Sequence, residues 1–150
     1  MSTRLAIPNR RNHSTQKVRI ADLRTLYITV HDDPQPAEIF LRVKGTDCSS
    51  ELIGLYDVIA RLMSLALQYG APLEKVGDLL AGAKFAPCGQ VSGHEHIKHC
   101  TSLPDLIGRH LLVVYCGRED LAHQKTLSGN KGINVVSGAF EKSIKTIIKA

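Results

Sequence analysis

Long hydrophobic runs are missing from this 150-residue sequence. Hydrophobic residues make up 43% of the chain, but Arg, Asp or Gly interrupts the apolar stretches well short of the ~20 residues that a membrane-spanning helix needs. The segment 1–13 has no continuous apolar core and places its basic residues after the apolar ones, the reverse of a secretory signal. We therefore expect a cytoplasmic protein with no membrane association. A single domain of this length buries roughly 70% of its unfolded surface.

Paired cysteines and the common catalytic motifs are missing as well. The four cysteines, Cys48, Cys88, Cys100 and Cys116, form no CxxC pair, which predicts free thiols. The chain has no GxSxG, Walker A or GxGxxG motif, and the GNKG stretch at 129–132 lacks the strand–loop–helix setting of a phosphate loop. We assign no catalytic residue.

Aromatic residues account for only 5% of the chain, and tryptophan is absent. Proteins that bind single-stranded nucleic acid usually interleave aromatic and basic side chains. The basic N-terminal segment offers arginines without aromatics, so its sequence does not favour that activity.

Positive charge is concentrated at the N-terminus. Residues 1–30 hold six basic residues and one acidic residue, which accounts for the net charge of +5. We divide the chain into a basic arm (1–16) and a single domain (17–150). A basic segment on a neutral body indicates an anionic partner, such as a nucleotide, a nucleic acid or an acidic protein surface. A solvated, partly disordered arm is the alternative.

The first half of the domain alternates in the manner of β-strands and then changes to a helical period. Residues 17–30 predict one or two strands, and 38–45 predict another after a proline-rich turn. Residues 47–69 repeat apolar positions every three or four residues, including Leu55 and Leu62, which predicts the central helix.

The second half predicts shorter helices. One begins at Pro72 and ends near Gly82, and another is capped by Ser102, with Asp105 reaching back, and runs to Cys116. The intervening loop carries one short strand. The fold class is α+β, an N-terminal antiparallel hairpin or meander followed by three to four helices packed on one face of the sheet.

Towards the C-terminus we expect a last strand at 133–136 and an amphipathic helix at 138–149. The apolar stripe of this helix is Phe140, Ile144, Ile147 and Ile148. Soluble monomers avoid exposing such a stripe, so we predict a homo-oligomer, most simply a twofold dimer, with this helix at or near the interface. An intramolecular cap over the sheet is the alternative.

Five soft or borderline metal ligands lie within 13 residues: Cys88, His94, His96, His99 and Cys100. Zinc accepts four ligands of these types, and His94 and His96 would share a face if their segment were a strand. The spacing matches no common zinc pattern. We therefore predict no metal, with this cluster as the alternative site.

Six sequence blocks, in order, resemble a known family. They are IPNRR, LYITV, PAEIFLRV, ELIGLYDVIARLMSLALQYGAPLEKV, FAPCG and HCTSLPDLIGRHL. Across roughly residues 4–120 they are similar to the TSCPD domain, the C-terminal accessory region of adenosylcobalamin-dependent (class II) ribonucleotide reductases. SLALQYGAPLEKV at 64–76 is the most specific block. Ala37 stands where the family usually has Gly, and Leu103 where it has the Cys of its name.

The resemblance implies a freestanding accessory domain of ribonucleotide reduction, not catalytic by itself. It would dock on a reductase catalytic subunit or bind nucleotides, and adenosylcobalamin would be bound only by that partner, with no cofactor on this chain. The alternative is a protein that holds or sequesters a nucleotide-derived phosphate ligand.

Candidate ligand contacts come from the arginines, whose guanidinium groups suit phosphate oxygens, and from polar positions in the family blocks. The candidates are Arg4, Arg10, Arg11, Arg19, Gln68, Tyr69 and Arg109. For Arg109, an ion pair with Asp105 four residues earlier is the alternative.

Overall fold

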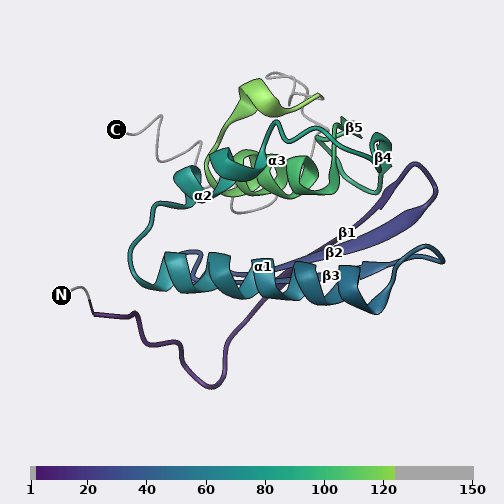
Figure 1. Cartoon of the computed structure of the whole chain (residues 1–150). Coiled ribbons are helices and arrows are strands. Elements are labelled where there is room, and N and C mark those ends of the chain that lie inside the picture. Colours follow the sequence, from purple (N-terminus) through teal and green to yellow (C-terminus); the bar gives the residue numbers. More distant parts are fainter. Residues whose placement is uncertain (1–2, 124–150) are drawn as a thin grey trace.

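The computed structural model describes residues 3–123, in which three strands lead and three α-helices with two further short strands follow, an α+β fold (Figure 1). The elements are β1 (Ser14–Ile20), β2 (Arg24–His31), β3 (Glu38–Lys44), α1 (Ser50–Gln68), α2 (Leu73–Leu80), β4 (Gly89–Ser92), β5 (His99–Cys100), α3 (Leu103–Tyr115) and a 3₁₀ turn (Glu119–Leu121). The strand expected at 133–136 and the helix expected at 138–149 lie outside the described residues.

The sheet is antiparallel, with strand order β3-β2-β1-β4-β5. β1 and β2 pair along their whole length, from Ser14 opposite Val30 to Ile20 opposite Arg24. β2 pairs with β3 in the same way, so that three strands in sequence order form the main part of the sheet. The alternation in β3, where Ile39, Leu41 and Val43 are buried between exposed neighbours, is typical of a sheet covered on one face.

The helices cover that apolar face. α1 packs along β3, while α2 and α3 pack against each other and lie beside α1 over the sheet (Figure 1). Strand residues such as Ile28, and helix residues such as Met63 and Leu106, belong to one hydrophobic cluster. The other face of β1–β3 has no helix over it in the described part of the chain.

Two glycines allow α2 and α3 to approach closely. A Cβ atom added at Gly77 would lie 2.7 Å from the Leu112 side chain, and one at Gly108 would lie 2.5 Å from the backbone nitrogen of Ala81. Both distances are below van der Waals contact. The absence of a side chain at these two positions is therefore a packing requirement.

Most of the predicted elements are confirmed, and three details are corrected. β1 begins at Ser14, so the last residues of the expected arm 1–16 belong to the sheet, because their backbone extends the hairpin although their side chains are polar. The loop after α2 contains two short strands instead of one. Leu55 and Leu62, expected on the packing face of α1, are 53% and 61% exposed.

Among residues 3–123, no helix is both long enough and apolar enough to cross a membrane.

Candidate functional site

The N-terminal arm is bonded to the body of the domain. The backbone nitrogen of Leu5 donates to the carbonyl oxygen of Gln68 at 2.7 Å, and Arg4 Nε donates to Gln68 Oε1 at 2.7 Å. Gln68 is buried and donates in turn through Nε2 to the carbonyl of Ala37 at 3.0 Å. Two of the predicted ligand contacts, Arg4 and Gln68, are thus joined to each other and connect the arm to α1 and β3.

A second arginine of the arm is neutralised by a carboxylate. Arg11 makes a two-pronged contact with Glu38, in which Nη2 lies 2.8 Å from Oε1, and its Nη1 donates to the carbonyl of Pro8 at 2.9 Å. His13 Nε2 lies 3.5 Å from the same carboxylate. Such a paired guanidinium adds little attraction for a free phosphate, because Glu38 already occupies its donors.

The arm also forms one wall of an open cavity of about 330 Å³ beside the end of β2. Its lining residues are Pro8, Arg10, Arg11, Asn12, His31 and Asp33. The Asp33 carboxylate shares the cavity with Arg10, and Glu38 balances Arg11. The charges at this cavity therefore nearly cancel, and its geometry gives weak support to a phosphate site.

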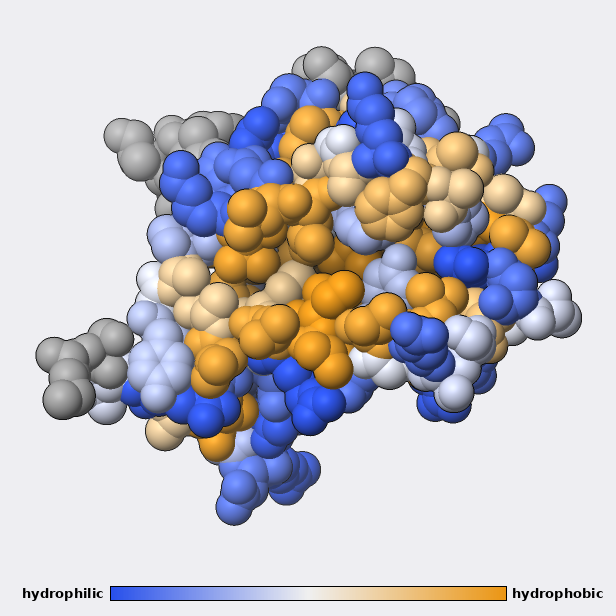
Figure 2. Space-filling model, in the orientation of Figure 1, coloured by the Kyte–Doolittle hydropathy of each residue, from blue (hydrophilic) through white to orange (hydrophobic). Residues whose placement is uncertain are grey.

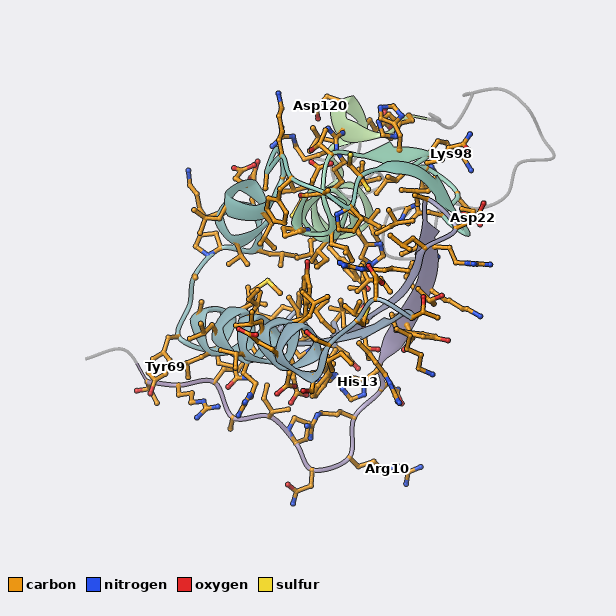
Figure 3. The ribbon with its side chains drawn as sticks, turned by 45° about the vertical axis from the view of Figure 1, so that its right-hand side comes forward. Arg10, His13, Asp22, Tyr69, Lys98 and Asp120 are labelled. Atoms are coloured by element: carbon orange, nitrogen blue, oxygen red, sulfur yellow. The ribbon has the colours of Figure 1, made fainter. Side chains whose placement is uncertain are left out.

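Apart from Arg10, which also lines this cavity, the remaining predicted contacts lie elsewhere. Arg10 lies at the turn of the arm and Tyr69 lies beyond the end of α1, while Asp22, which follows Arg19 by three residues, is at the far end of the sheet (Figure 3). Arg109 on α3 donates to the Asp105 carboxylate at 3.0 and 3.1 Å. The seven predicted residues do not form one site, and for Arg109 the expected alternative, an ion pair, is what the structure contains.

The histidine and cysteine cluster is dispersed. His94 is buried and its Nδ1 accepts from the backbone nitrogens of His96 and Ile97, both at 3.1 Å. His99 stacks on His123 with ring centroids 3.6 Å apart. Among the described residues, no group of three or more His, Cys, Asp or Glu side chains is arranged to hold a metal ion. The segment 93–98 is a loop, so the strand geometry that would align His94 with His96 is not formed.

The partner of His94 is a residue that the sequence did not single out, His110 on α3. His94 Nε2 lies 3.0 Å from His110 Nδ1, and because His94 Nδ1 accepts two bonds, its Nε2 carries the proton and donates. Burial lowers the pKa of His94 to about 4 and that of His110 to about 3. His110 lies three and four residues from Ile107 and Leu106, so the helical period of α3 places it in the core stripe.

Cys100 is also buried, and burial raises the pKa of its thiol to about 11. Cys88 is exposed. The two thiols therefore differ in access, and a protonated Cys100 is a poor nucleophile at neutral pH.

A stripe of exposed apolar residues runs along α1. It consists of Leu55, Val58, Leu62, Leu65 and Tyr69, whose exposed fractions run from 41% to 61%. Figure 2 shows apolar residues gathered in a band across this side of the molecule, over α1 and below α2, with polar residues above and below the band. The residues are three and four positions apart, the spacing that packs one helix against another. We call these five residues the α1 stripe.

A comparison with family models matches residues 2–115 to the TSCPD domain. This chain belongs to the TSCPD domain family. Over 122 residues it is 36% identical to a vitamin B12-dependent ribonucleotide reductase of Agrobacterium fabrum, a match that covers 80% of this chain and 9% of the reductase. Over 131 residues it is 34% identical to a vitamin B12-dependent ribonucleotide reductase of Bradyrhizobium diazoefficiens, a match that covers 87% of this chain and 10% of the reductase. No solved structure matches significantly.

The TSCPD chain thus spans about a tenth of the length of these curated reductases. In those reductases the matched region is one small part of a much longer chain. The family resemblance expected from the sequence blocks is confirmed.

The structure shows what the TSLPD block of this TSCPD domain does. Ser102 caps α3 by accepting from the backbone nitrogen of Asp105 at 2.9 Å. The buried Asp105 carboxylate accepts from the backbone nitrogens of Gly82 at 2.7 Å and Thr101 at 3.0 Å, and from Arg109. Burial raises the pKa of Asp105, but these donors outweigh it and hold that pKa below its ordinary value. The block is a structural corner that joins α2, the following loop and α3.

Proposed function

We propose that this TSCPD domain is an accessory domain of ribonucleotide reduction that docks on a B12-dependent reductase catalytic unit through the α1 stripe and has no catalytic residue of its own. In this proposal the cobalamin is bound by the catalytic unit. Two findings support the choice of partner. The related proteins are named vitamin B12-dependent ribonucleotide reductases, and this chain matches only about a tenth of their length.

The α1 stripe is the observation that carries the proposal. α1 already buries Tyr56, Ala60, Met63 and Leu67 against the sheet, so its fold requires no further apolar residues. The stripe adds four leucine or valine positions and a tyrosine on a second side of the same helix. Contiguous exposed apolar surface of this kind marks interaction sites, because burying it in a complex removes it from water.

The polar features of the domain agree with a binding role. The cluster named as the alternative metal site is dispersed within residues 3–123, and His94 and His110 are hydrogen-bonded to each other in the core. The arginines Arg11 and Arg109 are committed to carboxylates. The α1 stripe, in contrast to these groups, is exposed to solvent over 41% to 61% of each residue.

The test measures binding of this chain to a purified B12-dependent reductase catalytic chain from the same genome by isothermal titration calorimetry. We expect the double variant Leu62→Glu/Leu65→Glu to weaken binding by more than about 10-fold, because each charge would have to be buried in the interface. Glutamate is a good helix former, so α1 should remain folded.

Leu79→Glu is the matched control. Leu79 is 84% exposed on α2 and lies outside the α1 stripe, so this variant introduces one leucine-to-glutamate change on another surface, and its effect is compared with that of each single stripe variant. It should bind like the wild type. Absence of binding by the wild type, or equal losses in the stripe and control variants, would refute docking through this surface.

A further inference from the structure

The uncovered face of the sheet gathers side chains from three strands. In β1–β3 the residues that alternate with the buried positions point away from the helices. We call this set the open face, and its central residues are Thr15, Lys17, Arg19, Thr25, Tyr27, Thr29, Phe40, Arg42 and Lys44. Figure 3 shows side chains with nitrogen tips projecting from the strands on this side of the sheet.

The open face is predominantly positive. It contains four cations, Lys17, Arg19, Arg42 and Lys44, and one carboxylate, that of Glu38 at the start of β3. None of the four is in an ion pair with a carboxylate of residues 3–123. The nearest acidic position along β3, Glu38, is already paired with Arg11. The open face therefore presents four charges that remain available to an anionic partner.

An aromatic ring lies at the centre of these cations. The register places Tyr27 between Lys17 on β1 and Arg42 on β3. The ammonium groups of Lys17 and Lys44 lie 5.9 and 5.4 Å from the centroid of the Tyr27 ring. Cations within about 6 Å of a ring face are attracted to it. The Tyr27 ring therefore lies close to two ammonium groups, one from each neighbouring strand.

A second aromatic residue lies beside the first. Phe40 is 44% exposed, and the register places it opposite Thr29, one cross-strand row away from Tyr27. Diagonal neighbours on adjacent strands are roughly 7–8 Å apart. Along β3, Phe40 lies between Arg42 and Glu38, and the His13 ring packs edge-on against it with centroids 5.5 Å apart. Two exposed rings on adjacent strands can each accept one base of an extended strand.

We propose that the open face binds single-stranded nucleic acid, with bases stacked on Tyr27 and Phe40 and phosphates contacted by Lys17, Arg19, Arg42 and Lys44. Aromatic side chains accept any base, and basic side chains follow the backbone, which makes such a surface tolerant of sequence. In a duplex the bases are stacked on one another, so the rings would have no base to accept. An acidic protein surface would satisfy the cations but would not need the rings.

The lysines over Tyr27 are compatible with this site. A cation–π contact at an exposed position is weaker than stacking of a base on an aromatic ring. A base can therefore replace one ammonium group at the ring, and the lysine then remains close enough to contact the neighbouring phosphate. The threonines of the open face leave room between the larger side chains, and Thr15 and Thr29 are hydrogen-bonded to each other at 2.9 Å.

The experiment is fluorescence anisotropy with labelled oligothymidylate of about 12 nucleotides, within the usual range of single-strand sites. The wild type should bind at about 50 mM salt, and the logarithm of the association constant should fall with the logarithm of salt concentration by about 0.7 per phosphate contact. Duplex of the same length should compete at least about 10-fold less well, because its bases are not available for stacking.

Two sets of variants identify the surface. Tyr27→Ala should weaken binding by about 5- to 100-fold, the range for loss of one stacked base, while Tyr27→Phe keeps the ring and should stay within about 2-fold of the wild type. Lys17→Glu/Lys44→Glu should weaken binding by more than about 10-fold. Lys75→Glu/Lys84→Glu is the control, since it changes the net charge equally at exposed positions outside the open face.

Equal losses in the two lysine pairs would overturn the proposal, because attraction would then depend on net charge alone. Tyr27→Ala without effect, or heparin and duplex competing as well as the single strand, would also overturn it and would point to an acidic protein or another polyanion. Thermal melting of each variant checks that it is folded. If Tyr27→Ala does not fold, the comparison of the two lysine pairs decides whether the open face binds the single strand. Leu62→Glu should leave nucleic-acid binding unchanged, which separates this proposal from docking through the α1 stripe.

Discussion

α1 and α3 cover the same face of one sheet, yet they differ sharply in burial. Ten of the 13 residues of α3 are buried, against six of the 19 residues of α1. α3 packs between the sheet and α2, whereas α1 contacts the sheet on one side and leaves the α1 stripe exposed on another. The comparison shows that two apolar helices of one domain can bury very different fractions of their residues. α3 stabilises the domain, and we infer that α1 both stabilises it and docks.

The largest contrast should come from one leucine in each helix. Leu106 on α3 is fully buried, and Leu106→Ala should lower the free energy of unfolding by about 2–5 kcal/mol through lost burial and a cavity. Leu62→Ala removes the same atoms from a side chain that is 61% exposed. It should change the free energy of unfolding by less than about 0.5 kcal/mol. Urea denaturation measures both. Similar values for the two variants would break the comparison.

The buried histidines make the α3 side sensitive to pH. His94 and His110 have pKa values of about 4 and about 3 in the folded protein, below the ordinary value of about 6.5 in the unfolded chain. The unfolded state therefore binds more protons below pH 6.5. This contribution to stability is complete above about pH 6.5 and is lost as the pH falls towards the folded pKa values.

At about pH 5 the loss should be of the order of 2–4 kcal/mol for the pair, measured as urea denaturation against pH. His110→Gln keeps an acceptor for His94 Nε2 and removes one of the two titrating groups. In this variant the loss of unfolding free energy between about pH 6.5 and pH 5 should be about half of that in the wild type. A profile identical to that of the wild type would show that other groups cause the dependence.

A pair of glycines sharpens the comparison. Replacing glycine by alanine should lower the stability of the protein when it is made in α3 and raise it when it is made in α1. Gly108→Ala on α3 places a Cβ 2.5 Å from the backbone of α2 and should destabilise by about 1–3 kcal/mol. Gly54→Ala on α1 meets nothing within 4 Å and should stabilise by about 0.5–1 kcal/mol. Thermal melting tests both variants. Stabilisation by Gly108→Ala would contradict the close packing of α2 on α3.

The smallest effect on stability concerns assembly. The homo-oligomer predicted from the stripe of residues 138–149 stays a prediction, and light scattering of the full chain and of a chain ending at Gly138 checks it. We expect an oligomer that becomes a monomer on truncation, with little change in the melting temperature of residues 3–123. A full-length monomer would contradict the prediction, and an oligomer that survives truncation would place the interface elsewhere.

Local signals in the sequence predicted the elements of the fold. The predicted cap of α3 by Ser102 is confirmed. At α1 the cap is Ser49, whose hydroxyl accepts from the backbone nitrogen of Leu52, and Gly70 follows the helix with a positive φ of 97°. The reach of Asp105 is corrected in one detail, because its carboxylate accepts from Thr101 and Gly82 and not from Ser102. These features depend on residues a few positions apart, and short-range geometry is fixed by the local sequence.

The candidate sites were harder to predict. Clustering in the sequence suggested that His94, His96 and His99 act together, but His94 is bonded to His110, sixteen residues later. Similarly, Tyr27 lies beside Lys17 and Arg42 only through strand pairing. A loop conformation and a pairing register place such groups together, and neither follows from composition along one segment.

By itself, the sequence determined the family, the α+β class and the order and ends of most elements. Block order, hydrophobic periodicity and helix caps all depend on residues that are close together along the chain. Only the tertiary structure decided which apolar residues are covered. Periodicity places Leu55 and Leu62 among the apolar residues of α1, but burial depends on which other elements pack against that side, and among residues 3–123 none covers the α1 stripe.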